Sequence, residues 1–326
     1  MRVQVGDVRL FFDVDGAQLV PDGKVMRERP TLLLLHGGPG FDHTQFKPQF
    51  EQLRDVAQVI YLDHRDNGRS DRIEADGCSL ERWGDDVRAF CDALEIRRPI
   101  VLGVSFGGFV AQAYATRHPD HPGALILCST SARHPEDRVL DMFERLGGRE
   151  ARDVAAVYFR DTSTKTMREY ARRCLPLYTR RPEDPDAMTR ILPHANFDLT
   201  VTFFRDEFHR FDFRDALARV RCPTLVVAGE NDPITPAADS EDIAAALPSG
   251  LVRLVRFPGC GHPVYHDDEE GFFRVVREFL GSLGEEAAAA RSRLRSRSRL
   301  SEVPPPQAAR GTAPCAAVSR RASRGR

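Results

Sequence analysis

The segment GVSFG at residues 103–107 places Ser105 at an abrupt change in sequence pattern. A short apolar run, Ile100–Val104, ends just before the serine, and the helix-like run Phe106–Arg117 begins just after it. A strand that turns sharply into a helix holds a serine hydroxyl on an exposed, strained corner. Small residues two positions before and after the serine are needed there because the backbone nearly folds on itself. The pattern therefore predicts that Ser105 is a nucleophile.

A base and an acid with matching positions follow later in the chain. Serine at its ordinary pKa is a poor nucleophile and needs an adjacent general base. Asp232 follows the strand-like run 224–228 and His262 follows the strand-like run 251–257, which is the chain order typical of this arrangement. We predict that His262 accepts the proton of Ser105. Asp232 would fix the histidine tautomer and stabilise the imidazolium.

Two neighbouring residues are weaker candidates for these roles. Glu230 lies two residues before Asp232 and is the alternative acid. Cys260 lies two residues before His262, but no strand-to-helix turn surrounds it, so a thiol nucleophile is disfavoured.

The segment HGGPG at 36–40 follows directly after the apolar run Thr31–Leu35. Its glycines allow backbone N–H groups to approach a ligand closely. A tetrahedral intermediate carries an oxyanion that needs two such donors, one from the residue after the nucleophile and one from a loop after an earlier strand. We therefore predict an oxyanion hole formed by the N–H groups of Gly38 and Phe106.

All of these candidates follow short apolar runs of strand length. Such continuous runs predict strands buried on both faces of a sheet. Helix-length segments, such as 80–94 and 106–117, alternate with them, which predicts an α/β fold with a mostly parallel central sheet and helices on both faces. Residues 3–5 and 8–14 are expected to form a β-hairpin before the first of these runs. The runs are Thr31–Leu35, 56–62, Ile100–Val104, Ala124–Cys128, 224–228 and 251–257.

One long interval, between Cys128 and Thr224, contains no convincing strand. It predicts a helical cap over residues 131–215, inserted after a central strand, while residues 1–130 and 216–282 form the core. Such an insertion lies at the carboxyl edge of the sheet, where ligands bind in open α/β folds. Helices are expected over 136–146, 151–159, 166–175 and 185–192.

Charge is spread unevenly along the chain. Residues 281–326 hold ten Arg and three Glu, a net charge of +7, so the remainder carries −8 of the total of −1. A mildly acidic body argues against nucleic-acid binding by the folded part. Residues 283–326 lack hydrophobic periodicity, which predicts a disordered Arg-rich tail; a nucleic-acid or membrane tether is the functional alternative.

The seven cysteines include no CxxC pair, which indicates a reducing compartment and no structural zinc. No apolar run is long enough for a secretory signal or a membrane span. We therefore expect a cytoplasmic protein that acts on a small-molecule or short-peptide substrate and has no membrane partner.

Asp63, Arg65 and Ser70 follow the strand-like run 56–62 and resemble catalytic residues in type. We interpret them as structural, with the charged pair bracing the turn.

Five motifs together resemble the proline iminopeptidase branch of the α/β-hydrolases. They are HGGPG at 36–40, DHRDNGRSD at 63–71, GVSFGG at 103–108, GEND at 229–232 and GCGH at 259–262. The likeness spans about residues 1–280 and implies the α/β-hydrolase fold, a Ser-His-Asp triad, and no metal or other cofactor. Members of this branch remove N-terminal residues, often proline. This chain departs from the family at three positions. The family usually has Gln in place of His64 and Gly in place of Asp66, and Trp is common in place of Phe106.

The resemblance also points to a residue that binds substrate. In that family, glutamates of the cap hold the substrate's amine, and Glu207 occupies the best matching place. It lies in the segment 201–213, which also holds Asp206, Asp212 and five Phe that could line a pocket. The alternative is an amphipathic helix whose Phe side chains dock on the core while its acids face water.

Two functions therefore remain open at the level of sequence. The first is an aminopeptidase that releases an N-terminal residue through an acyl-enzyme. The second is an esterase, lactonase or thioesterase, because relatives with HGGPG include such enzymes. A receptor without catalysis is disfavoured because every catalytic position is filled, and a haloalkane dehalogenase or epoxide hydrolase would need Asp in place of Ser105.

Overall fold

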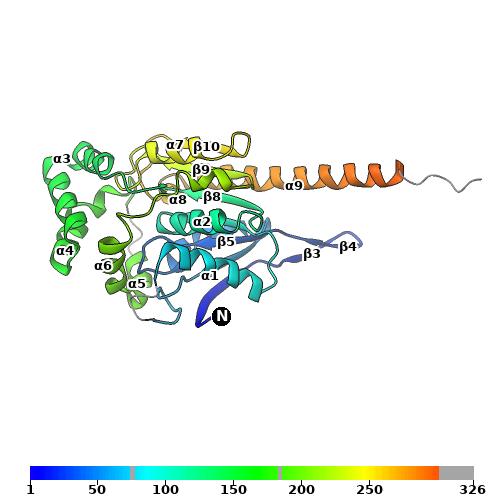
Figure 1. Cartoon of the computed structure of the whole chain (residues 1–326), viewed down its shortest axis with the longest axis horizontal. Helices are drawn as coiled ribbons and strands as arrows, with labels where there is room; N and C mark the ends of the chain where they lie inside the picture. Colours follow the sequence, from blue (N-terminus) through cyan, green and yellow to red (C-terminus); the bar gives the residue numbers. More distant parts are fainter. Residues whose placement is uncertain (74–77, 183–185, 301–326) are drawn as a thin grey trace, which may run out of the picture. The chain divides into compact units, whose positions relative to one another are not determined.

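A computed structural model of the chain describes residues 1–73, 78–182 and 186–300, with side chains described up to residue 285. The described part contains an eight-stranded sheet in the order β1-β2-β6-β5-β7-β8-β9-β10 (Figure 1). β2 pairs antiparallel with β1 and β6, and all other neighbours are parallel, so the predicted mostly parallel α/β fold is confirmed. The strands are β1 (Arg2–Val5), β2 (Val8–Asp15), β5 (Thr31–Leu35), β6 (Gln58–Leu62), β7 (Ile100–Val104), β8 (Ala124–Cys128), β9 (Thr224–Gly229) and β10 (Val252–Phe257).

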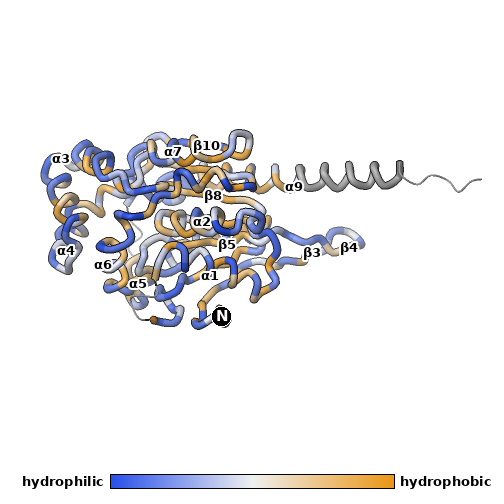
Figure 2. The backbone as a smooth tube through the Cα atoms, in the orientation of Figure 1, coloured by the Kyte–Doolittle hydropathy of each residue, from blue (hydrophilic) through white to orange (hydrophobic). Residues whose placement is uncertain are grey.

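The central strands β5, β7, β8 and β9 are buried along their whole length. Successive side chains of a strand point to opposite faces of the sheet. Leu33 and Leu35 belong to the core cluster that includes Trp83, whereas the equally buried Leu32 and Leu34 face the other way. Both faces therefore need apolar side chains, which is why these strands are unbroken apolar runs in the sequence (Figure 2).

Helices cover both faces of this sheet. α1 (Leu80–Ala93) and α2 (Phe106–Arg117) pack on each other, and α2 also packs on β7. Ser79 caps α1 by accepting a hydrogen bond from the N–H of Arg82, as expected of a helix N-cap serine. In α9 (Glu269–Leu300), Phe272 and Phe273 contact Phe50. The other helices of the core are η1 (His43–Phe46), η2 (Gln49–Asp55), η6 (Ala216–Arg219), α7 (Ala237–Ala246) and α8 (Val264–Asp267).

Between β8 and β9 the described chain is helical, and these helices gather beyond one end of the sheet (Figure 1). The two helices predicted over 136–146 and 151–159 are joined as α3, which is broken at Gly148, where φ is 75°. The insertion belongs to the same compact unit, Met1–Leu280, as the sheet. Its helices are α3 (Glu136–Arg160), α4 (Thr164–Arg173), η4 (Leu175–Leu177), α5 (Ala187–Ile191), η5 (Leu192–His194) and α6 (Phe197–Asp206).

Two features differ from the sequence-based expectation. A second hairpin of β3 (Leu19–Asp22) and β4 (Val25–Glu28) follows β2; its strands are mostly exposed and lack an apolar run. The disordered tail was expected from residue 283, but α9 continues to Leu300. Ala, Glu, Arg and Leu, which dominate residues 285–300, have high helix propensity, which favours continuation of a helix that has already begun. The rest of the expected tail, 301–326, lies outside the described residues.

The chain divides into two compact units, Met1–Leu280 and Gly281–Arg326. None of the helices in the described part combines the length and the apolar character needed to cross a membrane.

Truncation after Gly284 tests this division. Among the residues whose side chains the structure describes, the buried side chains of α9, from Phe272 to Leu280, precede the cut, so we expect unchanged turnover and a melting temperature within about 2 °C of the full chain. Differential scanning calorimetry of both proteins measures this. A decrease of several degrees would contradict it.

Candidate active site

Ser105 lies at a tight turn between β7 and α2. Its backbone angles, φ 55° and ψ −118°, are unusual for a residue other than glycine and cost on the order of 1–3 kcal/mol. The turn is held by hydrogen bonds: the Ser105 N–H donates to the carbonyl of Cys128 (3.0 Å), and the Ser105 carbonyl accepts from the Thr130 hydroxyl (2.9 Å). The predicted strand–serine–helix arrangement is therefore present, and the surrounding structure enforces the strained backbone.

The glycines on either side of Ser105 allow this turn to close. A Cβ on Gly107 would lie 2.0 Å from the carbonyl oxygen of Leu35, and a Cβ on Gly103 would lie 2.3 Å from that of Gly107. Any larger residue would push β5, β7 and α2 apart. The sequence predicts small residues at these positions because the backbone nearly folds on itself, and this packing agrees with that reason.

The pair His262 and Asp232 lies beside the same end of the sheet. His262 Nδ1 is 2.8 Å from Oδ2 of Asp232, which is fully buried. The carboxylate also accepts the N–H groups of Ile234 (2.9 Å) and Thr235 (3.0 Å) and the Thr235 hydroxyl (2.7 Å). A buried carboxylate with this many donors is held in place, and its bond to Nδ1–H leaves Nε2 of His262 free to accept a proton. Glu230, the alternative acid, pairs instead with Arg256 (2.8 Å).

Ser105, Asp232 and His262 follow the carboxyl ends of β7, β9 and β10, which all run in parallel in one sheet. The half-buried Ser105 hydroxyl makes no hydrogen bond with any residue that the structure describes. Catalytic hydrogen bonds of unliganded enzymes are often long and shorten only when substrate binds.

The 36–40 loop lies against the serine, since a Cβ on Gly37 would be 3.5 Å from Cβ of Ser105. Two N–H groups of this loop have partners: Gly37 donates to the Gln45 side chain (3.2 Å) and Gly40 to that of Asn67 (2.7 Å). Within the described residues, the N–H groups of Gly38 and Phe106 donate to no protein atom. These are the two donors that the sequence predicts for the oxyanion.

Phe106 is held by aromatic contacts. Its ring is fully buried and lies edge-on to Trp83 (4.9 Å between centroids), Phe203 (5.3 Å) and His64 (5.5 Å). Because Phe203 belongs to α6, the cap helps to position the residue that follows the nucleophile.

Sequence reasoning missed the role of His36. Its Nδ1 donates to the carbonyl of Gly37 (2.8 Å), and its Nε2 accepts from the N–H of His64 (3.3 Å). Burial lowers the pKa of His36, so the ring stays neutral with one tautomer fixed. The signal in the sequence was a histidine directly after a fully buried strand.

The charged residues that follow β6 are structural, but they do not pair with each other. Arg65 binds Asp86 through two bonds of 2.7 Å and Asp7 at 3.0 Å. Asp63 accepts the ring N–H of His43 (2.6 Å). The sequence-based expectation of a pair between Asp63 and Arg65 is corrected, because each has a closer partner on another element.

Glu207 immediately follows α6, and its Oε1 accepts the N–H of Leu80 (3.1 Å), at the first turn of α1. The phenylalanines around it mostly pack on one another and on the core, as in the alternative interpretation of this segment. Asp206 pairs with Arg205 and Asp212 pairs with Arg214.

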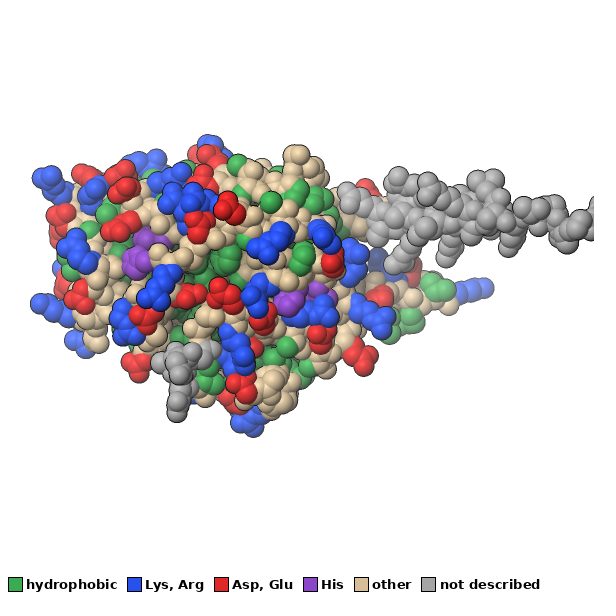
Figure 3. Space-filling model, in the orientation of Figure 1, with side chains coloured by type: hydrophobic (Ala, Val, Ile, Leu, Met, Phe, Trp, Pro, Cys, Tyr) green, Lys and Arg blue, Asp and Glu red, His purple; other side chains and the backbone are tan. Residues whose placement is uncertain are grey.

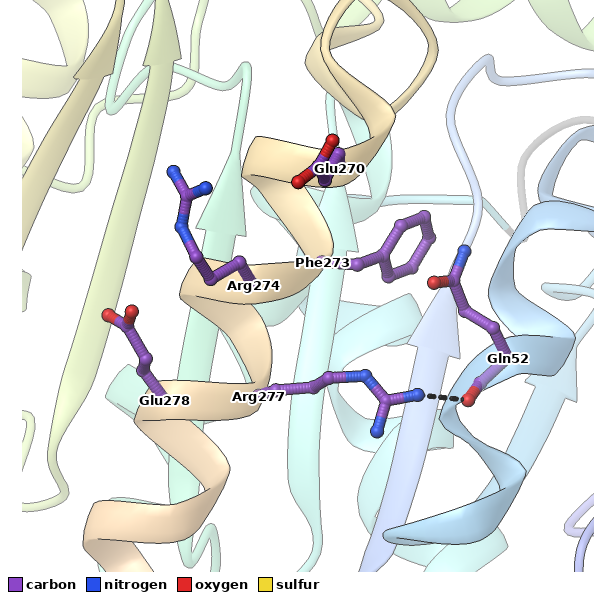
Figure 4. A pocket seen from close by; sticks show the side chains of 6 residues that line it. All are labelled: Gln52, Glu270, Phe273, Arg274, Arg277 and Glu278. Carbon is purple, nitrogen blue, oxygen red and sulfur yellow. Dashed lines mark hydrogen bonds between the residues drawn. The ribbon is translucent and has the colours of Figure 1, made fainter.

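A surface hollow among the described residues lies between α9 and η2 (Figure 4). Arg277 of α9 reaches across it to the carbonyl of Gln52. None of the candidate catalytic residues lines it. The lining residues are Gln52, Glu270, Phe273, Arg274, Arg277 and Glu278.

The family model of the alpha/beta hydrolase fold matches residues 30–269. Proline iminopeptidase PfmaB of Pestalotiopsis fici is 28% identical over 285 residues, covering 83% of this chain and 98% of that protein. The crystal structure of proline iminopeptidase from Mycobacterium smegmatis is 25% identical, with a TM-score of 0.71 over 88% of this chain and 99% of the other. A thermophilic esterase from Thermogutta terrifontis is 27% identical. Its TM-score is 0.66, and the match covers 87% of this chain and 99% of the esterase. The resemblance proposed from the motifs is thereby confirmed.

The buried histidines make stability depend on pH. Burial lowers the pKa of His64 well below 6.5, and its Nε2 has no partner among the described residues. The unfolded chain therefore binds a proton that the folded chain excludes, so stability is full above about pH 6.5 and falls as the pH decreases. The free energy of unfolding should therefore decrease between pH 7 and pH 5. We expect His64→Gln to make this decrease smaller by up to about 2 kcal/mol.

Urea unfolding at both pH values measures this difference. His194→Gln, which changes a half-buried histidine of the cap, is the control. Its free energy of unfolding should change between the two pH values as that of the wild type does. If the free energy of unfolding of His64→Gln decreased between pH 7 and pH 5 as much as that of the wild type, the role given to His64 would be contradicted.

Proposed function

Because this chain belongs to the alpha/beta-hydrolase family, we propose that it is a serine hydrolase with Ser105 as nucleophile, His262 as general base and Asp232 as the residue that orients the histidine. The observation that carries the proposal is the 2.8 Å bond between His262 and the fully buried Asp232, on the sheet edge where Ser105 occupies a strained turn.

The reaction proceeds in two halves. His262 Nε2 takes the hydroxyl proton of Ser105 as the oxygen attacks the substrate carbonyl. The N–H groups of Gly38 and Phe106 stabilise the oxyanion. The leaving group takes the proton from His262, and water, activated by the same histidine, then releases the acyl group from Ser105. No step uses a metal ion.

We propose a short peptide as substrate, with cleavage after its N-terminal residue. Removing an α-ammonium group from water is costly unless a carboxylate meets it. Glu207 is the candidate, because Oε2 makes no hydrogen bond within the described residues while Oε1 is fixed by Leu80. Similarity to two proline iminopeptidases supports this substrate class.

Hydrolysis of a small ester or lactone is the second candidate. It is favoured by the similarity to the Thermogutta terrifontis esterase over nearly the whole of that chain. The contact of Glu207 with the N-terminus of α1 also gives this carboxylate a structural role that needs no substrate amine.

Ser105→Ala tests the nucleophile. We expect turnover to fall by about 10³-fold or more and labelling by a fluorophosphonate probe to stop, because the attacking oxygen is gone. Cys260→Ala is the matched control. Burial raises the pKa of that thiol to about 11, so it stays protonated and its removal should leave labelling intact. Labelling of the Ser105→Ala protein would rule out the assignment.

Glu207→Gln tests the substrate class. Glutamine keeps an oxygen that can accept the Leu80 N–H but removes the charge, so KM for aminoacyl-arylamides should rise by about 10-fold or more while aryl esters are spared. Asp206→Asn is the control, because Asp206 is paired with Arg205. Steady-state kinetics on both substrate series give the comparison.

N-acetylated substrates separate the two candidates in the wild-type protein. An aminopeptidase should hydrolyse them poorly because the ammonium group is missing. Equal turnover of acetylated and free-amine substrates would exclude the aminopeptidase and leave the esterase.

A further inference from the structure

Three side chains of the cap, none of them used in the proposed reaction, come together at its surface. His134, Glu136 and His209 each offer a nitrogen or oxygen ligand atom, and the three atoms lie within 4.8 Å of one another. His134 lies two residues before the start of α3, Glu136 is the first residue of α3, and His209 follows α6. Histidine side chains are exposed near the cap helices on the face shown in Figure 3.

His134 has a buried ring nitrogen without a partner. The centroid of its ring lies 4.1 Å from the ring centroid of Phe208 and 5.2 Å from that of Phe159. Its Nε2 makes no hydrogen bond with any described residue. A buried polar atom without a partner is unfavourable, and such atoms in folded proteins call for a ligand or another explanation.

One ring nitrogen of His209 has a carbonyl partner, which fixes the tautomer of the ring. Its Nε2 lies 3.1 Å from the carbonyl oxygen of Phe159, so Nε2 carries the proton and Nδ1 has the free lone pair. Metal-binding histidines typically donate their second ring N–H to a carbonyl or carboxylate in this way, which fixes the tautomer. Glu136 is exposed and forms no ion pair within the described residues, so its carboxylate is available.

We propose that His134, Glu136 and His209 bind a divalent transition-metal ion, with zinc as the best match. Two imidazole nitrogens and one carboxylate suit zinc, with water in a fourth position. Tetrahedral ligands at about 2.0–2.1 Å from zinc stand about 3.3 Å apart, so the atoms must approach by roughly 1.5 Å at most. The exposed side chains of His209 and Glu136 can make this movement. The expectation of no structural zinc concerned cysteine ligands, and this site uses none.

The charges around the site set its strength. Glu136 contributes one negative charge, and a histidine that binds a metal ion contributes none. Arg133 is the residue directly before His134, and its positive charge opposes the cation. A site of moderate affinity follows from this balance.

The ion would join the chain before α3 to the chain after α6. Most of the cap lies between these points, so binding requires the folded cap and stabilises it. The site is independent of the proposed reaction, which uses none of its residues.

The test uses the full chain without an affinity tag, stripped with EDTA and titrated with zinc chloride in a calorimeter. We expect one zinc ion per chain and a melting temperature raised by several degrees at saturating zinc. His209→Ala and Glu136→Gln, both at exposed positions, should each weaken binding by about 10-fold or more. The matched controls His194→Ala and Asp137→Asn should bind as the wild type does.

Absence of zinc binding by the wild type, or unchanged affinity in both His209→Ala and Glu136→Gln, would overturn the proposal. Hydrolysis measured in EDTA distinguishes this site from the proposed function, because removing the ion should lower the melting temperature without abolishing turnover. Loss of turnover in Ser105→Ala with zinc binding retained would show that the two sites are separate.

Discussion

The close approach of three backbone segments is the constraint on which the rest of the site depends. β5, β7 and α2 meet where Gly107 touches the carbonyl of Leu35, and no Cβ fits between them. This contact turns the chain sharply enough to present Ser105 at the edge of the sheet, and it sets the 36–40 loop beside the serine. The unfavourable backbone angles of Ser105 persist because the fully buried strands on either side cannot move apart without exposing apolar surface.

Buried polar groups then fix the loops that follow the strands. Asp232 has no exposure to solvent and satisfies its oxygens with two backbone N–H groups, a hydroxyl and His262. His36 uses both ring nitrogens to join its own loop to the next one, and Arg65 binds two carboxylates. Each buried group would be costly without its partners, so the loops have one favourable arrangement. The energy that holds the site is therefore spread over many residues, and some of them, such as His36 and Arg65, have no part in the proposed reaction.

Much of this could be predicted from sequence, for identifiable reasons. An unbroken apolar run such as Thr31–Leu35 has few alternatives to a buried strand, and parallel order then sends Ser105, Asp232 and His262 to one edge. Partner choice could not be predicted. Arg65 binds Asp86, on a helix, and Glu207 binds the N-terminus of α1, because tertiary packing decides which charges meet. The exposed β3–β4 hairpin and the extension of α9 carry no apolar periodicity, so the pattern contained no signal for them.

The cap contacts each loop of the candidate active site. Phe203 packs on Phe106, the carbonyl of Tyr178 accepts the N–H of His262 (2.7 Å), and the Thr200 hydroxyl donates to the carbonyl of Pro39 (2.9 Å). These contacts explain why the cap and sheet form one compact unit. They also limit how substrate preference can change. A substitution at these points would disturb the loops that hold Ser105, His262 and Pro39, so a change in substrate preference is better tolerated at cap residues that do not contact these loops.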